Sequence, residues 1–140
     1  FWRQVYNSGI ARINLYKKYP ESLKLVHLLP MVFTVGVTGT LLLLFFGFLP
    51  YMLGTVHVFP ILGNAMAALG CIGLLGIILY IIALFIDSSR KNHSVKIGVL
   101  SIRAAFTQLM GYGCGFLSAW WKRCLLGQSE FSAYNKTFYK

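Results

Sequence analysis

Two long uncharged stretches dominate the middle of the chain. Residues 25–49 carry no formally charged side chain, and neither do residues 61–86. About 20 such residues are enough to cross the hydrocarbon layer as a helix, so each stretch predicts a transmembrane helix. The segment between them begins with Pro50, ends with Pro60 and contains no lysine or arginine. The pattern therefore predicts a helical hairpin over residues 25–86, closed by a short turn.

A third apolar segment, residues 104–121, is weaker because it contains Thr107, Gln108 and three glycines. We expect a third helix over residues 104–124 that spans the membrane, re-enters it or lies at its interface. Residues 125–140 form a polar and aromatic tail with no pattern that fixes a fold. Small residues four apart predict close packing of helices within this bundle; they occur at Gly36-xxx-Thr40, Gly63-xxx-Ala67 and Gly111-xxx-Gly115.

The first 24 residues have a different, amphipathic pattern. At about 100° per residue, one helical face holds Trp2, Val5, Tyr6, Gly9, Ile13 and Tyr16. The other face holds Arg3, Asn7, Asn14 and Lys18. Tryptophan and tyrosine favour the headgroup level, and Pro20 ends the helix before the first span. Residues 1–24 are therefore expected to form a basic interfacial helix and a linker, which completes an all-α membrane fold.

The charge distribution predicts the orientation of the hairpin. The chain has 13 Lys+Arg against 3 Asp+Glu, a net charge of +10, and is 57% hydrophobic. Such a composition excludes an ordinary soluble domain, and no basic stripe outside the membrane flanks indicates nucleic acid as a partner. Basic residues cluster before the first span and within residues 87–103. By the positive-inside rule, the N-terminal side and a basic loop at residues 87–103 are expected in the cytoplasm.

The sequence offers little catalytic chemistry. Its three acids, Glu21, Asp87 and Glu130, are scattered, and the three cysteines lack the spacing of metal ligands. We therefore predict no catalytic residue and no metal site within this chain. Asp87 is expected to pair with Arg90 or to cap a helix.

One polar feature of the first helix is a candidate binding site. Gln4, Ser8 and Arg12 are spaced four residues apart and so form a ridge along one edge of the helix. A ridge of this kind can face a bound anion. The alternative for Arg12 is simple contact with lipid headgroups.

The sequence resembles a known protein family. The first 20 residues look like the stretch that follows the catalytic domain in membrane-bound family-2 glycosyltransferases of bacterial exopolysaccharide type. The resemblance rests on Arg3-Gln4, Tyr6, Gly9, Ala11-Arg12 and Pro20, on the two spans, and on Tyr112-Gly113-Cys114-Gly115-Phe116-Leu117, which is similar to a Y-G-x-G-F-L element near the end of such enzymes. It covers nearly the whole chain.

The resemblance implies an enzyme of the bacterial inner membrane whose nucleotide-sugar domain, with an Asp-x-Asp motif for Mg or Mn, lies upstream of Phe1. This part would bind no cofactor itself; its partners would be the bilayer, that upstream domain and a lipid-linked or polysaccharide acceptor. Processive relatives carry Gln-x-x-Arg-Trp, and Gln4 is followed by no Arg-Trp, which favours transfer of a single sugar. The alternative function is a fragment of a transporter or a non-catalytic membrane scaffold subunit, although a transporter would be expected to carry polar groups near the bilayer midplane.

Overall fold

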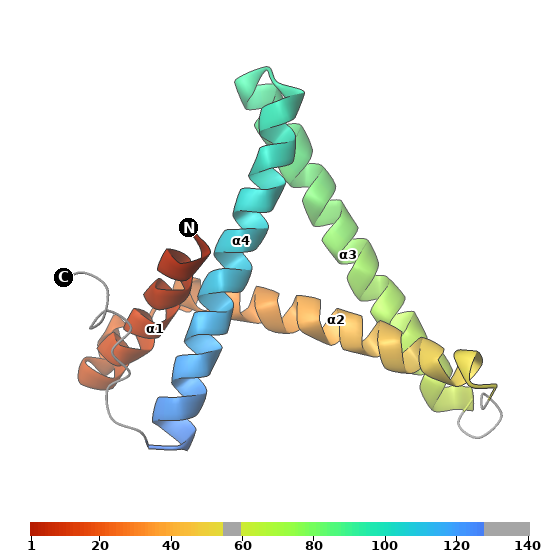
Figure 1. Ribbon diagram of the computed structural model, residues 1–140, viewed down its shortest axis with the longest axis horizontal. Coiled ribbons are helices and arrows are strands. Elements are labelled where there is room, and N and C mark those ends of the chain that lie inside the picture. Colours follow the sequence, from red (N-terminus) through yellow and green to blue (C-terminus); the bar gives the residue numbers. More distant parts are fainter. Residues whose placement is uncertain (55–59, 128–140) are drawn as a thin grey trace. The chain divides into compact units, whose positions relative to one another are not determined.

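The computed structural model of the chain describes residues 1–54 and 60–127 (Figure 1). In these residues it contains four α-helices and no strand, so the all-α prediction is confirmed. The helices are α1 (Trp2–Lys18), α2 (Leu29–Met52), α3 (Pro60–Asn92) and α4 (Val95–Trp120). Short 3-10 turns at Pro20–Ser22 and Leu25–His27 connect α1 to α2, and a π-helical turn, Trp121–Leu125, follows α4.

Two of the helical stretches are long and apolar enough to cross a membrane. They are Leu25–Met52, with 28 residues, and Pro60–Asn92, with 33 residues. In their most apolar windows only 17% and 6% of the residues are buried inside the chain, whereas the core helix of a soluble protein would be mostly buried. The two helices thus indicate a membrane-associated protein, as predicted. Among the described helices α4 does not pass the same test, and it begins with the basic residues Lys96 and Arg103.

The helices extend beyond the boundaries expected from hydropathy. α2 continues past Pro50 to Met52, and the Leu53 N–H still donates to the Leu49 carbonyl at 3.1 Å. Pro50 removes one helical donor near the end of the helix without ending it there. The expected turn therefore begins later than Pro50, and residues 55–59 lie outside the described residues. The tail also lies outside them from residue 128 onward.

Residues 87–103, predicted as a basic loop, are helical except at His93 and Ser94. α3 runs to Asn92 and α4 begins at Val95, so only two residues separate them (Figure 1). The physical reason is that this segment contains no proline, and arginine and lysine are good helix formers that extend a helix beyond its apolar part.

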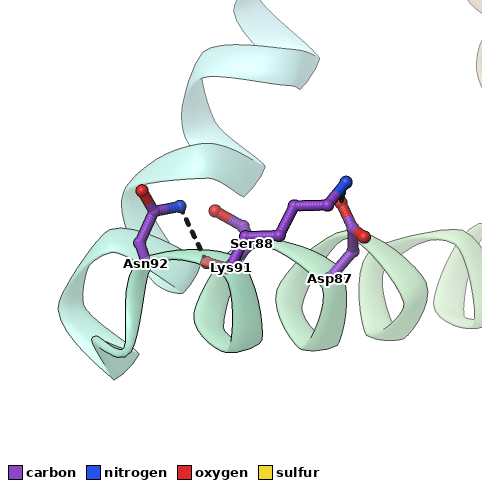
Figure 2. A network of polar contacts seen from close by, with 4 residues as sticks. All are labelled: Asp87, Ser88, Lys91 and Asn92. Atoms are coloured by element: carbon purple, nitrogen blue, oxygen red, sulfur yellow. Dashed lines mark hydrogen bonds and ion pairs between the residues drawn. The ribbon is translucent and has the colours of Figure 1, made fainter.

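Polar contacts stay within the last turns of α3 (Figure 2). Asp87 pairs with Lys91 at 3.0 Å, one helical turn on, rather than with Arg90 as expected. The Asn92 side chain donates to the Ser88 carbonyl at 2.9 Å. Both members of the ion pair are largely exposed, so the pair contributes about 0.3–0.5 kcal/mol and orders the end of α3 rather than any site.

His93 forms the stop between α3 and α4. Its φ of 48° is left-handed, and the following Ser94 N–H returns to the Ser89 carbonyl at 3.2 Å. A side chain in this conformation carries a steric cost that glycine lacks.

We expect His93→Gly to raise the free energy of unfolding by about 1 kcal/mol and His93→Val to lower it, measured by denaturant titration in detergent micelles. Equal stability of both variants would contradict this account of the turn.

The chain folds as two compact units, Phe1–Thr34 with Arg103–Lys140, and Val35–Ile102. In the second unit α2 and α3 pack antiparallel through small residues. A Cβ added to Gly70 would lie 2.9 Å from the Leu44 side chain, and one added to Gly73 would lie 3.0 Å from a Thr40 carbon. Ala67, from the predicted Gly63-xxx-Ala67 pair, packs in the same way on Gly47. Small residues thus serve packing within the chain, as predicted for this pair.

Candidate functional site

The first unit is built on a contact between the backbones of α1 and α4. A Cβ at Gly9 would lie 2.7 Å from the Phe116 backbone nitrogen and nearer still to the Tyr112 carbonyl oxygen. A Cβ at Gly115 would lie 2.8 Å from the carbonyl carbon of Tyr6 and would overlap its oxygen. Neither clash can be relieved by moving a flexible side chain, because the atoms met are backbone. The two glycines therefore set how closely α1 and α4 approach.

A third glycine of α4 packs against the start of α2. A Cβ at Gly113 would lie 2.7 Å from the Thr34 side chain and would also meet the Pro30 carbonyl. The buried Thr34 hydroxyl lies 2.9 Å from the Pro30 carbonyl oxygen and 3.3 Å from that of Leu109, so it links α2 to α4. The end of α4 is thereby fixed by both α1 and α2.

An apolar hollow lies beside the small core of this unit. The core consists of Ile10, Ile13, Phe116 and Ala119. The hollow has a volume of about 260 Å³, and it is lined by Ile13, Tyr16, Leu23, Leu28, Met31, Phe116, Leu117 and Trp120. Its lining comes from α1, the linker, the start of α2 and the end of α4. It offers apolar contact and almost no polar chemistry.

Arg123 is the unusual charged residue of the unit. It lies in the π-helical turn after α4, and its side chain is buried, with 8% of the residue exposed. Its Nη1 donates to Asn14 Oδ1 of α1 at 2.6 Å, while its buried Nε has no hydrogen-bond partner. Among the described residues no carboxylate pairs with it. A guanidinium has five N–H donors, and the buried Nε donor of Arg123 is left unsatisfied.

The predicted ridge lies along α1, where the sequence places it. Gln4 and Ser8 are exposed, and Arg12 is half-buried. The Ser8 hydroxyl lies 2.9 Å from the Gln4 backbone carbonyl and donates to it, which leaves only its acceptor lone pairs for a ligand. An anion requires donors, so Gln4 and Arg12 are the members of the ridge suited to bind one. α1 contains no Asp or Glu, so no negative side chain of this helix competes with an anion for Arg12.

Sequence reasoning did not identify Arg123. The pattern of the first helix places Asn14 on the face opposite its apolar side, where no contact with Arg123 is expected. A signal was present, because Phe116, Ala119 and Arg123 are spaced so that all three fall on one face of a helix. The first two are core residues, so the third continues the buried face.

The described residues contain no cluster of three or more His, Cys, Asp or Glu that could hold a metal ion, and the three cysteines are free thiols. Comparisons with protein-family models, with curated proteins and with solved structures find no match to this chain. The site is thus defined by its own geometry. The first unit contains an apolar hollow, a buried cationic donor and a polar ridge on α1.

Proposed function

We propose that this chain is the membrane-anchoring C-terminal part of a family-2 glycosyltransferase of bacterial exopolysaccharide type. One observation carries the proposal. The two short motifs on which the resemblance rests lie far apart in the sequence, yet they pack on each other, with Gly9 against Tyr112 and Phe116, and Gly115 against Tyr6. Motifs that merely occur by chance in an apolar chain have no reason to meet in one contact.

In this proposal the chain transfers no sugar by itself. A nucleotide-sugar domain with its divalent metal, Mg or Mn, precedes α1 in the full enzyme, and the acceptor is a lipid-linked molecule or a polysaccharide. α1 lies at the cytoplasmic surface of the inner membrane, with the apolar helices α2 and α3 as the anchor. Gln4 and Arg12 then face the donor diphosphate or the acceptor.

The alternative is a transporter fragment or a scaffold subunit. Transporters place polar or charged groups near the bilayer midplane, where they bind the substrate. The side-chain bond between Tyr51 and Asn64 lies at the ends of α2 and α3 rather than at their centres. The described parts of both helices carry no charge until Asp87. An Asp-x-Asp motif at the end of a strand in the preceding coding sequence would decide for the enzyme.

The ridge provides the mechanistic test. We expect Arg12→Lys, in the full-length enzyme, to lower turnover about tenfold while membrane association and expression stay intact. Lysine supplies the same attraction to headgroups, about 1 kcal/mol, but lacks the planar fork that binds two oxygens at once. Gln4→Ala should act in the same direction. The measurement is the rate of sugar release from the nucleotide donor in reconstituted membranes.

Three variants serve as matched controls for Arg12→Lys. Lys17→Ala and Lys18→Ala remove exposed charges, and the Lys18 ammonium already lies over the Tyr19 ring at 5.6 Å. Ser8→Ala removes a hydroxyl that donates within α1. All three should leave turnover nearly unchanged. If Arg12→Lys turned over at the wild-type rate, α1 would serve only as an anchor, and Gln4 and Arg12 would not belong to the site.

A further inference from the structure

We infer that Arg123 and the apolar hollow together bind one anionic phospholipid, whose phosphate contacts the guanidinium and one of whose hydrocarbon chains enters the hollow. The inference does not depend on glycosyl transfer and holds equally for a membrane scaffold. It rests on three observations: a buried cation with an unpaired donor, an apolar hollow lined by residues close in sequence to that cation and its partner, and the size of that hollow.

The cation is the first observation. Removing a guanidinium from water without a counter-charge carries a penalty of several kcal/mol, so a buried arginine ordinarily has an anionic partner. Arg123 has the Asn14 amide oxygen on Nη1 and nothing on Nε. The Nε edge belongs to the fork through which arginine binds phosphate oxygens in two-point geometry. A phosphate there would supply an acceptor and a negative charge that residues 1–54 and 60–127 do not.

The second observation is that residues close in sequence to this cation and to its partner Asn14 line the hollow. Trp120, three residues before Arg123, lines the hollow, and so does Ile13, the neighbour of Asn14. One helical turn rises about 5.4 Å, so the backbone positions of Arg123 and Asn14 lie within about a turn of residues that line the hollow. The intervening backbone is the π-helical turn, a local distortion that is frequent at functional sites.

The size and chemistry of the hollow identify the occupant. Its volume of about 260 Å³ is below the range of roughly 300–1,000 Å³ typical of pockets for whole drug-sized ligands. An apolar hollow is a poor site for water, because a bound water needs polar partners. The hydrocarbon chains of a membrane beside the protein can fill such a hollow instead. Tyr16 and Trp120, on its lining, are residue types that favour the headgroup level. A charged head joined to a flexible apolar chain fits both halves of the site, whereas free phosphate fits only one.

Quenching of tryptophan fluorescence by brominated lipid chains tests the inference directly. Trp2→Phe and Trp121→Phe leave Trp120, on the hollow, as the sole tryptophan of the chain. The whole 140-residue chain is reconstituted in phosphatidylcholine vesicles with a minor fraction of phosphatidylglycerol, and either lipid carries the bromine. We expect brominated phosphatidylglycerol to quench Trp120 several-fold more per lipid molecule than brominated phosphatidylcholine does.

Arg123→Gln should bring this preference down to nearly equal quenching by the two lipids, because it removes the charge-assisted bonds to phosphate but retains an amide donor for Asn14. Arg3→Gln is the matched control, since it removes the same charge from an exposed position of α1 and should keep the preference. Should Arg123→Gln fail to fold, Leu28→Phe replaces it. The larger ring fills the hollow, and quenching by the brominated phosphatidylglycerol should fall to the level of phosphatidylcholine.

Three outcomes would overturn the inference. Equal quenching by the two lipids would show that no anionic lipid is selected, and full preference in folded Arg123→Gln would show that the guanidinium is not the headgroup site. Loss of the preference on addition of inorganic phosphate at constant ionic strength would assign Arg123 to a free anion instead of a lipid.

Discussion

Gly115→Ala should detach α1 from α4 and destabilise the unit formed by residues 1–34 and 103–140 by about 3 kcal/mol or more. The new methyl group would overlap the carbonyl of Tyr6, and the contact can open only by moving a whole helix. Overpacking that cannot be relieved by rotamer changes lies at the upper end of single-residue effects. The measurement is amide hydrogen exchange in micelles, in which the amides of α1 should lose protection while those at the α2–α3 contact keep theirs.

The chain provides matched controls for this variant. Gly36 in α2 and Gly76 in α3 also lie inside helices, but a Cβ at either would have no heavy atom within 4 Å. Alanine is the better helix former by about 1 kcal/mol, so Gly36→Ala and Gly76→Ala should leave exchange unchanged or slow it. If Gly115→Ala behaved like these controls, the close contact of α1 and α4 would be wrong.

Hydropathy predicts the two long apolar helices well, because a membrane-spanning segment has to meet a simple requirement. A spanning segment must bond all its backbone groups internally and expose apolar side chains, and both conditions are visible in the sequence. The ends of the helices follow other rules. Residues 87–97 are mostly polar and mostly helical, because α3 continues until the left-handed residue His93 ends it. Hydropathy does not report where such a helix-ending residue lies.

The amphipathic pattern of α1 identifies its apolar face but not the partner of that face. Gly9 and Ile13, on the face expected to meet lipid, are buried against α4, together with Ile10, while Trp2 stays exposed. A lipid surface and a neighbouring apolar helix select the same side chains, so periodicity alone cannot separate them. The glycine at position 9 is the better indicator, because a backbone contact needs glycine and a bilayer surface does not.

Small-residue spacing has a similar limit. Gly111-xxx-Gly115 and Gly63-xxx-Ala67 lie in helix contacts, as predicted, whereas Gly36 meets nothing and only Thr40 of that pair packs, on Gly73. Spacing shows that two small residues share a face, but contact depends on which residues a second helix brings opposite. The position of Arg123 depends in the same way on α1 supplying Asn14.

Cysteine labelling is expected to give an all-or-none result for the orientation of the hairpin. In a variant without the three native cysteines, Leu53→Cys should react with a membrane-impermeant maleimide added to intact spheroplasts, and Val95→Cys should react only after the membrane is opened. Both positions are exposed, at the end of α2 and at the start of α4, so reactivity reports the side of the membrane rather than burial. The measurement is the mass shift of the labelled protein.

The physical reason for this expected result is the distribution of positive charge around α2 and α3. Five basic residues precede the first span: Arg3, Arg12, Lys17, Lys18 and Lys24. More follow the second span at Arg90, Lys91 and Lys96, while the segment between the prolines has none. Moving either cluster across the membrane opposes the potential by about 2.3 kcal/mol per charge for each 100 mV, so we expect the hairpin to insert with both clusters on the cytoplasmic side. Reversed labelling would also place Gln4 and Arg12 away from any cytoplasmic nucleotide sugar, and the proposed glycosyl transfer would fail with the orientation.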